Sequence, residues 1–194
     1  MINLELPVGE EQIRDLRVGD EVSITGTMVT ARDAAHKYLI EESPEFIRPY
    51  LENSLIYHCG PVVRQEENQW KFVAAGPTTS IREEPYEGTL IRDYRVRGVI
   101  GKGGMGKKTL AALNEYGAVY LHAIGGLASM LAQAVHRVEE VFMLEEFGVP
   151  EAMWVIQVED FPAVVTMDSH MQSLHEEVRA QSDEVAERLI HPVV

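Results

Sequence analysis

The stretch VIGKGGMGKKTL, residues 99–110, combines four glycines with three lysines ahead of a helix-like segment. It nearly matches the phosphate-binding P-loop, in which a lysine is followed directly by a hydroxyl residue that reaches magnesium. Here Lys107 is followed by Lys108, and the hydroxyl of Thr109 comes one position late. Because one residue turns a helix by about 100°, Thr109 would point away from the metal. The spacing therefore disfavours a magnesium nucleotide as the ligand.

The same loop suits a small anion. Glycines let the backbone approach a ligand closely, and the amino terminus of a helix attracts negative charge. Lys102 and Lys107 are candidate charges for that anion. The alternative is a tight strand-to-helix turn whose lysines face water. The glycines concerned are Gly101, Gly103, Gly104 and Gly106.

The stretch TARDAAHK, residues 30–37, is a second candidate for anion binding. Arg32 and His36 are four residues apart and share one face of a helix, with Asp33 beside the arginine. An arginine can bind a carboxylate through two parallel N–H groups. An exposed surface pair explains the same spacing equally well.

The stretch AAGPTTSIRE, residues 74–83, is the third. Thr78, Thr79 and Ser80 follow Gly-Pro, and Arg82 stands four residues after Thr78. A hydroxyl among cations binds a carboxylate, or loses its proton more easily than usual. Hydroxyl runs after Gly-Pro also serve as ordinary turns and caps.

The charge distribution agrees with a small anionic ligand. The chain has a net charge of −14, which makes nucleic acid an unfavourable partner. Residues 71–108, however, hold 8 basic and 4 acidic side chains, a local net charge of +4. A small anion is attracted there, whereas a polyanion is repelled by the rest. A chance cluster of solvated charge is the alternative.

Length and composition predict one domain over residues 1–194, because 194 residues with 45% hydrophobic side chains suffice for one core. The amino terminus does not resemble a signal peptide, and no apolar run is long enough to span a bilayer. We expect a soluble, cytoplasmic protein without a membrane partner. The single cysteine, Cys59, cannot alone hold an iron–sulfur cluster or a thiolate zinc site.

Strand and helix patterns alternate along the chain and predict a mixed α/β fold. A long helix is expected over residues 127–142, because apolar residues recur there at helical spacing. Thr30 and Ser173 are expected to open helices through capping boxes. The other expected helices are 33–42, 107–117 and a carboxyl-terminal one; the expected strands are 21–29, 54–60, 70–76, 97–101, 118–124, and WVIQVEDF and AVVTM on either side of Pro162.

Six segments together resemble the beta component of class I fumarases and L-tartrate dehydratases. The resemblance runs in the family's order from about residue 5 to about residue 175. Each motif alone is weak, but the combination of the arginine–histidine segment, GPTTS and GKGGM is specific. The segments are TGTMVTARDAAHK, IYHCGPV, GPTTSIR, GVIGKGGMG, LHAIGGLASMLAQAV and VEDFPAVVTMDS.

The resemblance implies an oxygen-sensitive hydro-lyase that acts on a small dicarboxylate. It also implies that this chain assembles with an alpha subunit into a higher hetero-oligomer. The implied reaction is fumarate plus water giving L-malate, with L-tartrate dehydration as the alternative. The resemblance also implies a 4Fe–4S cluster that is bound by an alpha subunit. One iron of this cluster has no cysteine ligand and is expected to act as a Lewis acid on the substrate. The implied fold is a swivelling β/β/α domain.

The family's functional residues carry over by motif. Arg32, Arg82 and Lys102 match residues that hold the substrate carboxylates, and Thr78 matches the hydroxyl proposed as catalytic base. The chain departs from the family pattern at Glu83-Glu84-Pro85, where a methionine is expected, and this leaves the substrate less determined than the reaction. No metal ligand is expected in this chain. Supporting roles are expected for Asp33, His36, Thr79, Gly101, Gly103 and Gly104.

Two hypotheses of other classes compete with the enzyme subunit. One is a P-loop-like nucleotide-binding module, which predicts that ATP protects the glycine loop. The other is a non-catalytic scaffold subunit, which predicts that the partner chain is active alone.

Overall fold

A computed structural model describes residues 1–190, and its centre is a seven-stranded sheet in the order β1-β2-β3-β6-β7-β9-β8. The first five strands in this order run parallel, and β9 and β8 complete the sheet in antiparallel pairing. Helices and strands alternate as expected, so the mixed α/β class is confirmed. The strands are β1 (Ile2–Glu5), β2 (Glu21–Thr30), β3 (Leu55–Tyr57), β6 (Gly98–Gly101), β7 (Val119–His122), β8 (Val135–Phe142) and β9 (Met153–Met167).

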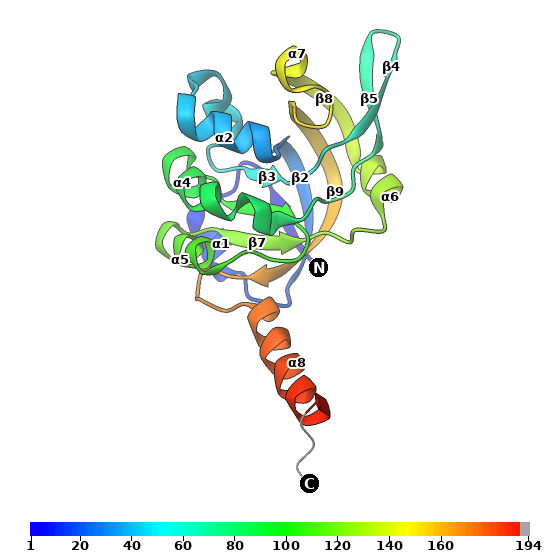
Figure 1. The fold of residues 1–194 in the computed structure, drawn as a ribbon. Coiled ribbons are helices and arrows are strands. Elements are labelled where there is room, and N and C mark those ends of the chain that lie inside the picture. The colour runs from blue at the N-terminus through cyan, green and yellow to red at the C-terminus, as the bar shows by residue number, and fades with distance from the viewer. Residues whose placement is uncertain (191–194) are drawn as a thin grey trace.

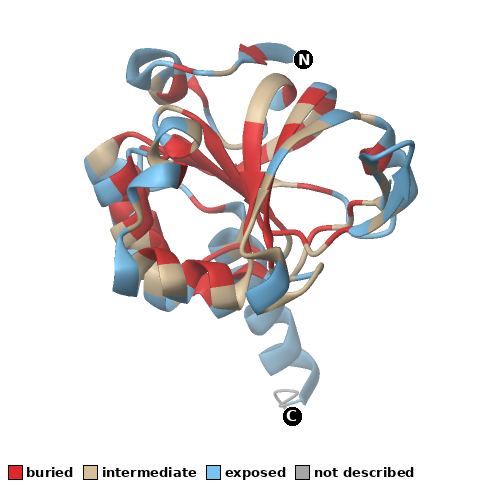
Figure 2. Cartoon of the chain, turned by 90° about the horizontal axis from the view of Figure 1, so that it is seen from above, coloured by how far each residue is buried: buried red, intermediate tan, exposed pale blue. Residues whose placement is uncertain are grey.

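The sheet closes on itself, because the long strand β9 pairs with β7 and also with β2. Strands β2, β3, β6, β7 and β9 thus form a ring, which Figure 1 shows curving around a common centre. Alternate residues of the ring strands, such as Ile24, Tyr57 and Phe161, point inward and form the largest buried cluster. Figure 2 shows this buried centre in red.

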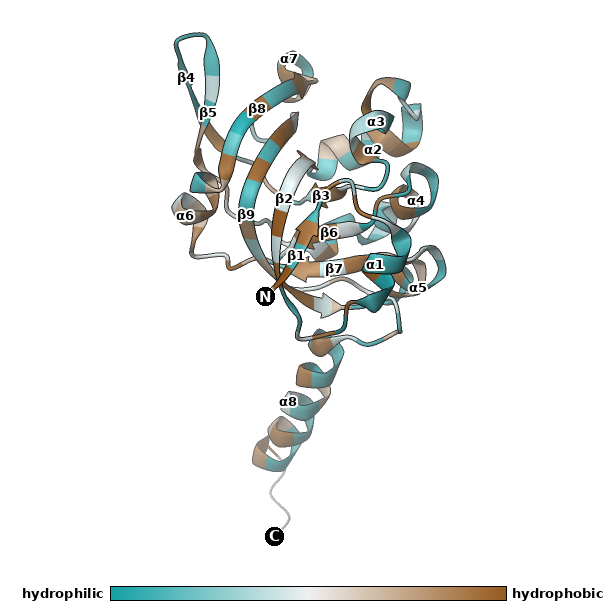
Figure 3. Cartoon of the chain, turned by 180° about the vertical axis from the view of Figure 1, so that it is seen from behind, coloured by the Kyte–Doolittle hydropathy of each residue, from teal (hydrophilic) through white to brown (hydrophobic). Residues whose placement is uncertain are grey.

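Helices cover the outside of the parallel strands. Most of their apolar faces pack on the opposite side of the sheet in two further buried clusters, around Leu39 and Leu90 and around Leu110 and Leu113, whereas Ile13 of the first helix joins the largest cluster. The hydropathy colouring of Figure 3 places the polar faces of these helices outward. The helices are α1 (Glu10–Asp15), α2 (Asp33–Glu42), α3 (Arg48–Leu51), α4 (Glu84–Tyr94) and α5 (Lys107–Tyr116), with 3-10 turns at Glu45–Ile47 and Ser80–Glu83.

A hairpin lies outside the seven-stranded sheet. Strand β4 (Val62–Glu66) lies between the expected strands 54–60 and 70–76, where no strand was expected, and it pairs with β5 (Gln69–Ala74). The turn itself is Glu67–Asn68, with φ values of +48° and +63°. Positive φ at both central residues is what a two-residue hairpin turn requires.

The expected long helix over residues 127–142 is wrong. Helix α6 (Ala128–Gln133) is short, and strand β8 follows it and pairs with β9. The register of β8 shifts between Val135 and Arg137 and again between Val138 and Glu140. Each bulge adds one residue, so inward positions recur every three residues, at 135, 138 and 141, instead of every two. Two bulges therefore gave a strand the apolar spacing of a helix.

Two other expectations need correction near the sheet. The segments on either side of Pro162 form one continuous strand, β9, with Pro162 opposite Ser23. Thr30 does not cap α2, since its hydroxyl accepts a hydrogen bond from the backbone N–H of Trp154 at 3.2 Å. The α5 expectation is confirmed, and Gly117 ends that helix in the left-handed conformation.

The carboxyl-terminal helix α8 (Leu174–Ile190) follows β9 and projects from the body, as Figure 1 shows; the short helix α7 (Leu144–Phe147) precedes β9. Ser173 opens α8 as expected, because its hydroxyl accepts the N–H of Glu176 at 3.4 Å. Every residue of α8 is at least partly exposed. Within residues 1–190, no helix combines the length and the apolarity needed to cross a bilayer.

Candidate functional site

The carboxyl ends of three adjacent parallel strands bring the predicted motifs together. Strand β2 ends just before Arg32, β3 ends just before His58, and β6 leads into Lys102. Strand β3 pairs in parallel with both β2 and β6, so all three ends lie at one edge of the sheet. In α/β proteins with parallel strands, both open sheets and closed barrels commonly bind ligands at that edge.

The GPTTS segment crosses this edge between β3 and β6. The N–H of Thr78 donates to the carbonyl of His58 at 2.7 Å, and the N–H of Lys102 donates to the carbonyl of Thr78 at 3.3 Å. Thr79 and Lys102 form a parallel bridge, and the N–H of Ser80 donates to the carbonyl of Lys102 at 3.1 Å. The hydroxyl of Thr78 donates to the same His58 carbonyl at 3.1 Å. Thr78, Thr79 and Lys102 are thus immediate neighbours, although 24 positions separate Thr78 from Lys102 in the sequence.

Arg32 lies at the same edge, pressed against the segment that follows β3. A Cβ at Gly60 would lie 2.7 Å from its Nη1, so only glycine fits there. The guanidinium Nε is 3.3 Å from a carboxylate oxygen of Glu151, and the other oxygen of Glu151 accepts the N–H of Ala34 at 3.0 Å. Arg32 is therefore held in place with part of its donor set still available.

Arg82 and Asp33 form a more exposed pair at the rim. Their closest N–O distance is 2.5 Å, with 56% of the arginine side chain and 35% of the aspartate exposed to solvent. Lys102, by contrast, forms no ion pair with a carboxylate in the part of the chain that the structure describes. Its Cδ would lie 3.5 Å from a Cβ at Gly125, which places its stem beside the loop after β7.

The glycine loop has the strained backbone that its sequence predicts. Gly103 and Gly104 have φ values of +82° and +77°, which side-chain-bearing residues rarely adopt. A Cβ at Gly104 would also lie 2.4 Å from the ring of His175. These two glycines therefore shape the turn between Lys102 and α5.

The amino terminus of α5 is not an open anion site, because the carboxylate of Glu84 already fills it. Glu84 accepts the N–H groups of Gly106, Lys108 and Thr109 at 2.7, 3.0 and 3.2 Å. It also accepts the hydroxyl of Thr109 at 2.7 Å. An internal carboxylate thus takes the place of the anion expected beside Lys107, and Lys102 is the lysine whose backbone pairs with Thr78–Ser80.

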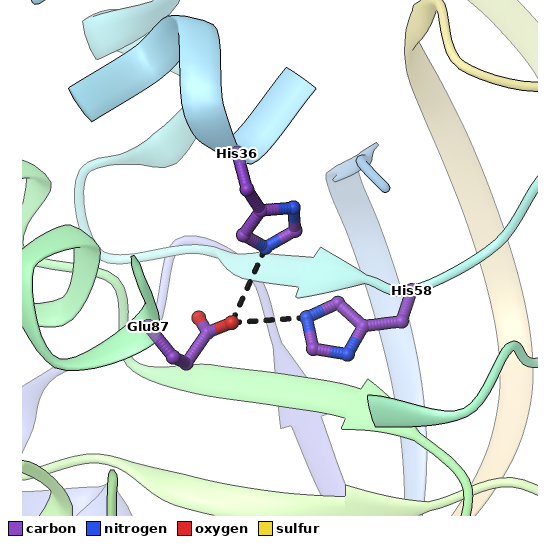
Figure 4. Close-up of side chains that lie close together, drawn as sticks. All are labelled: His36, His58 and Glu87. Atoms are coloured by element: carbon purple, nitrogen blue, oxygen red, sulfur yellow. Dashed lines mark hydrogen bonds and ion pairs between the residues drawn. The ribbon is translucent and has the colours of Figure 1, made fainter. Parts of the chain in front are cut away.

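Beneath the site lies a buried polar cluster that sequence reasoning largely missed. Figure 4 shows Glu87 of α4 between the rings of His36 and His58. Its Oε2 lies 3.0 Å from Nε2 of His58 and 3.2 Å from Nε2 of His36, and all three side chains are fully buried. The only signal in the sequence was His36 itself, since His58 and Glu87 come from segments 22 and 51 positions further along.

Two hydroxyls extend this cluster toward the glycine loop. Nδ1 of His58 lies 2.9 Å from the hydroxyl of Ser80, which in turn accepts the hydroxyl of Tyr120 at 2.8 Å. A Cβ at Gly101 would overlap Ser80 Oγ at 1.9 Å. Gly101 therefore has a supporting role that is steric, because it leaves room for this hydroxyl pair.

Burial and neighbouring charges set the ionisation of the cluster. Burial opposes ionisation of both Glu87 and His36, but their mutual attraction outweighs it, holding the pKa of Glu87 at about 2 and raising the pKa of His36. Burial lowers the pKa of His58, and the His36 charge adds to this effect. Burial raises the pKa of Glu83, whose carboxylate lies 3.7 Å from His36, to about 7. These directions favour the charged forms of His36 and Glu87 and the neutral form of His58.

The chain does not provide the ligands of an iron–sulfur cluster. Its one cysteine, Cys59, is fully buried at the end of β3, and burial raises the pKa of its thiol to about 12. A cluster needs several thiolates at a surface it can reach. Among the described residues, the one metal-compatible group is His36, His58 and Glu87, whose ligand atoms lie within 4.8 Å of one another.

Comparison with known proteins gives a consistent result. Residues 1–178 match the model of the family described as fumarase C-terminus. A Geobacillus stearothermophilus protein assigned by name to the class I fumarate hydratases is 53% identical over 194 residues. That match covers 100% of this chain but only 37% of the relative, so the chain spans little more than a third of that protein's length.

Two shorter relatives match over most of their own length. One is a Methanocaldococcus jannaschii protein named as an L(+)-tartrate dehydratase subunit beta, 42% identical over 184 residues, or 93% of this chain and 94% of the relative. The other is the L(+)-tartrate dehydratase subunit beta of Escherichia coli K12, which is 40% identical over 173 residues. This match covers 88% of this chain and 85% of the relative.

Proposed function

Because the chain belongs to the fumarase C-terminus family, we propose that it forms the substrate-holding part of an iron–sulfur hydro-lyase, with fumarate hydration to L-malate as the reaction. The observation that carries the proposal is the convergence of Arg32, Thr78 and Lys102 at the carboxyl ends of β2, β3 and β6. Two cations and a hydroxyl at one sheet edge suit a small dicarboxylate, which has two charges to neutralise.

Each residue has a distinct part in the proposed reaction. Arg32 and Lys102 bind substrate carboxylates, and Arg82 joins them from the rim by exchanging Asp33 for substrate. When the proton on the substrate carbon is removed, negative charge spreads into the adjacent carboxylate, and these cations stabilise it. Thr78 is the candidate base. Its hydroxyl donates to the His58 carbonyl at 3.1 Å. To act as the base it first loses this proton to solvent, which neighbouring cations favour, and the resulting alkoxide then takes the substrate proton and becomes the hydroxyl again.

The proposed site needs a second component. The lone buried Cys59 does not fit a cluster, so we assign the 4Fe–4S cluster to an alpha component and derive no step through it. An apolar hollow of about 210 Å³ beside the Lys102 loop supports docking of such a partner; Ile124 and Met130, which line it, are 59% and 45% exposed. A swivelling β/β/α domain over residues 1–194, a higher hetero-oligomer and a cytoplasmic location belong to the same proposal.

L-tartrate dehydration is the second candidate reaction. It is favoured by the two tartrate dehydratase beta subunits, which match this chain over 94% and 85% of their own length. The nucleotide-binding alternative is disfavoured by Glu84, which fills the helix terminus where a phosphate would bind.

The test is an assay of the chain co-purified without oxygen with an alpha-type partner, using fumarate, malate and both tartrates. Lys102→Met is expected to raise KM for the dicarboxylate at least tenfold, since a charged contact is worth about 1.5–3 kcal/mol. Lys107→Met is the matched control, because it removes a lysine of the same loop outside the site. Equal KM values for the two variants would remove Lys102 from substrate binding.

Thr78→Ala tests the chemistry itself. It is expected to lower kcat by at least a hundredfold with little change in KM, as removal of a general base does. A kcat within twofold of the wild type would exclude Thr78 as the base.

A further inference from the structure

Glu87 joins three separate segments beneath the site through one carboxylate oxygen. Oε2 contacts His36 of α2 at 3.2 Å and His58, just after β3, at 3.0 Å, while Glu87 itself belongs to α4. None of the three side chains is exposed to solvent. Figure 4 shows both histidine rings directed toward the carboxylate of Glu87. The proposed function assigns none of these contacts a role.

Each histidine reaches a residue of the proposed site through the backbone. Nδ1 of His36 donates to the backbone carbonyl of Arg32 at 2.9 Å, and the guanidinium of this residue is proposed to bind substrate. The carbonyl of His58 accepts both the N–H and the hydroxyl of Thr78. A shift of either ring would therefore move Arg32 or Thr78.

The polar neighbours of each ring nitrogen indicate where the protons are. Nδ1 of His36 faces a carbonyl, which only accepts, so it carries a proton. Nε2 lies 3.2 Å from the Glu87 carboxylate at ion-pair distance, without an aligned hydrogen bond, and a second proton there compensates the carboxylate charge. His36 is then a cation paired with a carboxylate. His58 donates from Nε2 to Glu87 and accepts at Nδ1 from Ser80, which describes a neutral ring.

We propose that His36, Glu87 and His58 form a positioning unit, in which one extra proton on His36 balances the charge of Glu87 and fixes Arg32 and Thr78 in their working geometry. The effect of this unit on the reaction rests on the proposed function, whereas the protonation of His36 does not. A buried ion pair loses several kcal/mol when one partner is removed, because the other charge remains without compensation.

A divalent cation is the competing explanation of the same three side chains. Two imidazoles and a carboxylate are suitable ligands for zinc, and their ligand atoms lie within 4.8 Å. Glu87 Oε2 lies only 3.0 Å from Nε2 of His58 and 3.2 Å from Nε2 of His36, distances at which a proton on each nitrogen suffices and no metal ion is needed between them. Our proposal therefore assigns the compensating positive charge to a proton. The two cases differ in a measurable way, because a metal would replace the proton at each Nε2.

The first test reads the protons directly in the full chain, without any assay of activity. Two-bond proton–nitrogen correlation spectra of the 15N-histidine-labelled chain are expected to show His36 with both nitrogens protonated and His58 neutral with its proton on Nε2. This pattern is expected to persist at pH 7. The charged groups that act on the two histidines are Glu83, Glu87 and Asp33, and Arg82 acts on Glu83. A neutral His36 at pH 7, or one equivalent of tightly bound metal by elemental analysis, would overturn the proposal.

The second test measures the consequence in the complex with the alpha-type partner. Glu87→Gln removes the charge at nearly constant shape, and we expect a tenfold or greater fall in kcat/KM, with KM raised through Arg32 and kcat lowered through Thr78. The matched control is Tyr94→Phe, which removes another buried contact between α4 and α2, the 2.9 Å hydrogen bond from Tyr94 to the carbonyl of Leu39. The control is expected to change neither constant more than twofold.

The two tests separate the two proposals. If the wild-type complex is inactive on all the dicarboxylates, the proposed function fails while the spectra still decide the protonation. If the wild type is active and Glu87→Gln keeps both kcat and KM per folded molecule, the positioning role is wrong even where the variant is less stable. Should Glu87→Gln not fold, the spectra of the wild type remain decisive.

Discussion

Gly101→Ala tests the packing beneath the site most sharply. A Cβ at this position would lie 1.9 Å from Ser80 Oγ, whereas real Cβ contacts below 3.0 Å are essentially never seen. The backbone of Ser80 is fixed by its bond to Lys102, so its hydroxyl has to rotate away. The conflict therefore breaks the contacts of Ser80 with His58 and Tyr120.

The size of the effect follows from the groups left without partners. Each buried polar group that loses its partner costs about 1–3 kcal/mol, and two are affected (His58 and Tyr120), so Gly101→Ala is expected to cost about 2–6 kcal/mol. For a chain of this size, about 2–4 °C of melting temperature corresponds to each kcal/mol, which gives a fall of roughly 4–24 °C. Urea unfolding of the isolated chain measures the free energy directly.

A double-mutant cycle with Ser80→Ala tests the cause. Once the hydroxyl is gone, the nearest atoms to the new Cβ are Tyr120 Oη at 3.1 Å and His58 Nδ1 at 3.2 Å, which need only small shifts. Gly101→Ala is then expected to cost at least about 2 kcal/mol less in the Ser80→Ala background than in the wild type. Equal costs in both backgrounds would refute the steric explanation.

Gly88→Ala is the matched control for the glycine itself. Gly88 lies inside α4, and a Cβ there would meet the Cβ of Ala112 at 3.5 Å and the carbonyl oxygen of Lys108 at 3.9 Å, both ordinary contacts. Alanine is the better helix former, so this change is expected to stabilise the chain by up to about 1 kcal/mol.

Three further predictions concern single side chains. Glu84→Gln is expected to destabilise the chain by about 2 kcal/mol in urea unfolding, because four donors of α5 lose a charged acceptor, whereas Lys107→Met is expected to stay within about 0.5 kcal/mol. Burial raises the pKa of Glu83 from 4.5 to about 7, so the stabilisation contributed by its protonated form is fully present below pH 4.5 and is lost as pH rises through 7. The melting temperature of the wild type is therefore expected to fall relative to that of Glu83→Gln over this interval, and parallel melting curves would contradict the burial of Glu83. Cys59, with its pKa raised to about 12, is expected to resist iodoacetamide at pH 8 in the native chain and to react in urea, as mass spectrometry would show; rapid native alkylation would place the thiol at the surface.

Local patterns in the sequence predicted the parallel part of the fold well. Short buried runs such as RGVIG, followed by a glycine turn and a helix that ends at Gly117, carry their signals within a few residues. The three candidate motifs, which the family resemblance assigned to one site, lie together because each follows a strand and the strands are parallel neighbours; the order of these strands was not predicted. Strand β8 was mistaken for a helix because its two bulges produce a three-residue repeat that only the pairing with β9 reveals.

The buried part of the site had no comparable signal. Glu87 lies in the helical segment EPYEGTLIRDY, where a glutamate ordinarily faces water, and only its tertiary position between two histidines makes it distinctive. Glu84 was noticed as a departure from the family pattern, but its function as the cap of α5 depends on a contact 25 positions away. Partners so distant in sequence cannot be paired by local spacing.

The central claim is that this chain supplies substrate-holding residues to a site completed by a cluster-bearing partner. The most direct measurement is the rate of fumarate hydration, and of L-tartrate dehydration, by this chain alone, by the alpha-type partner alone and by both together, all prepared without oxygen. We expect turnover only from the two together, and its loss with Thr78→Ala. Full activity of the partner alone would contradict the account and would make this chain a scaffold.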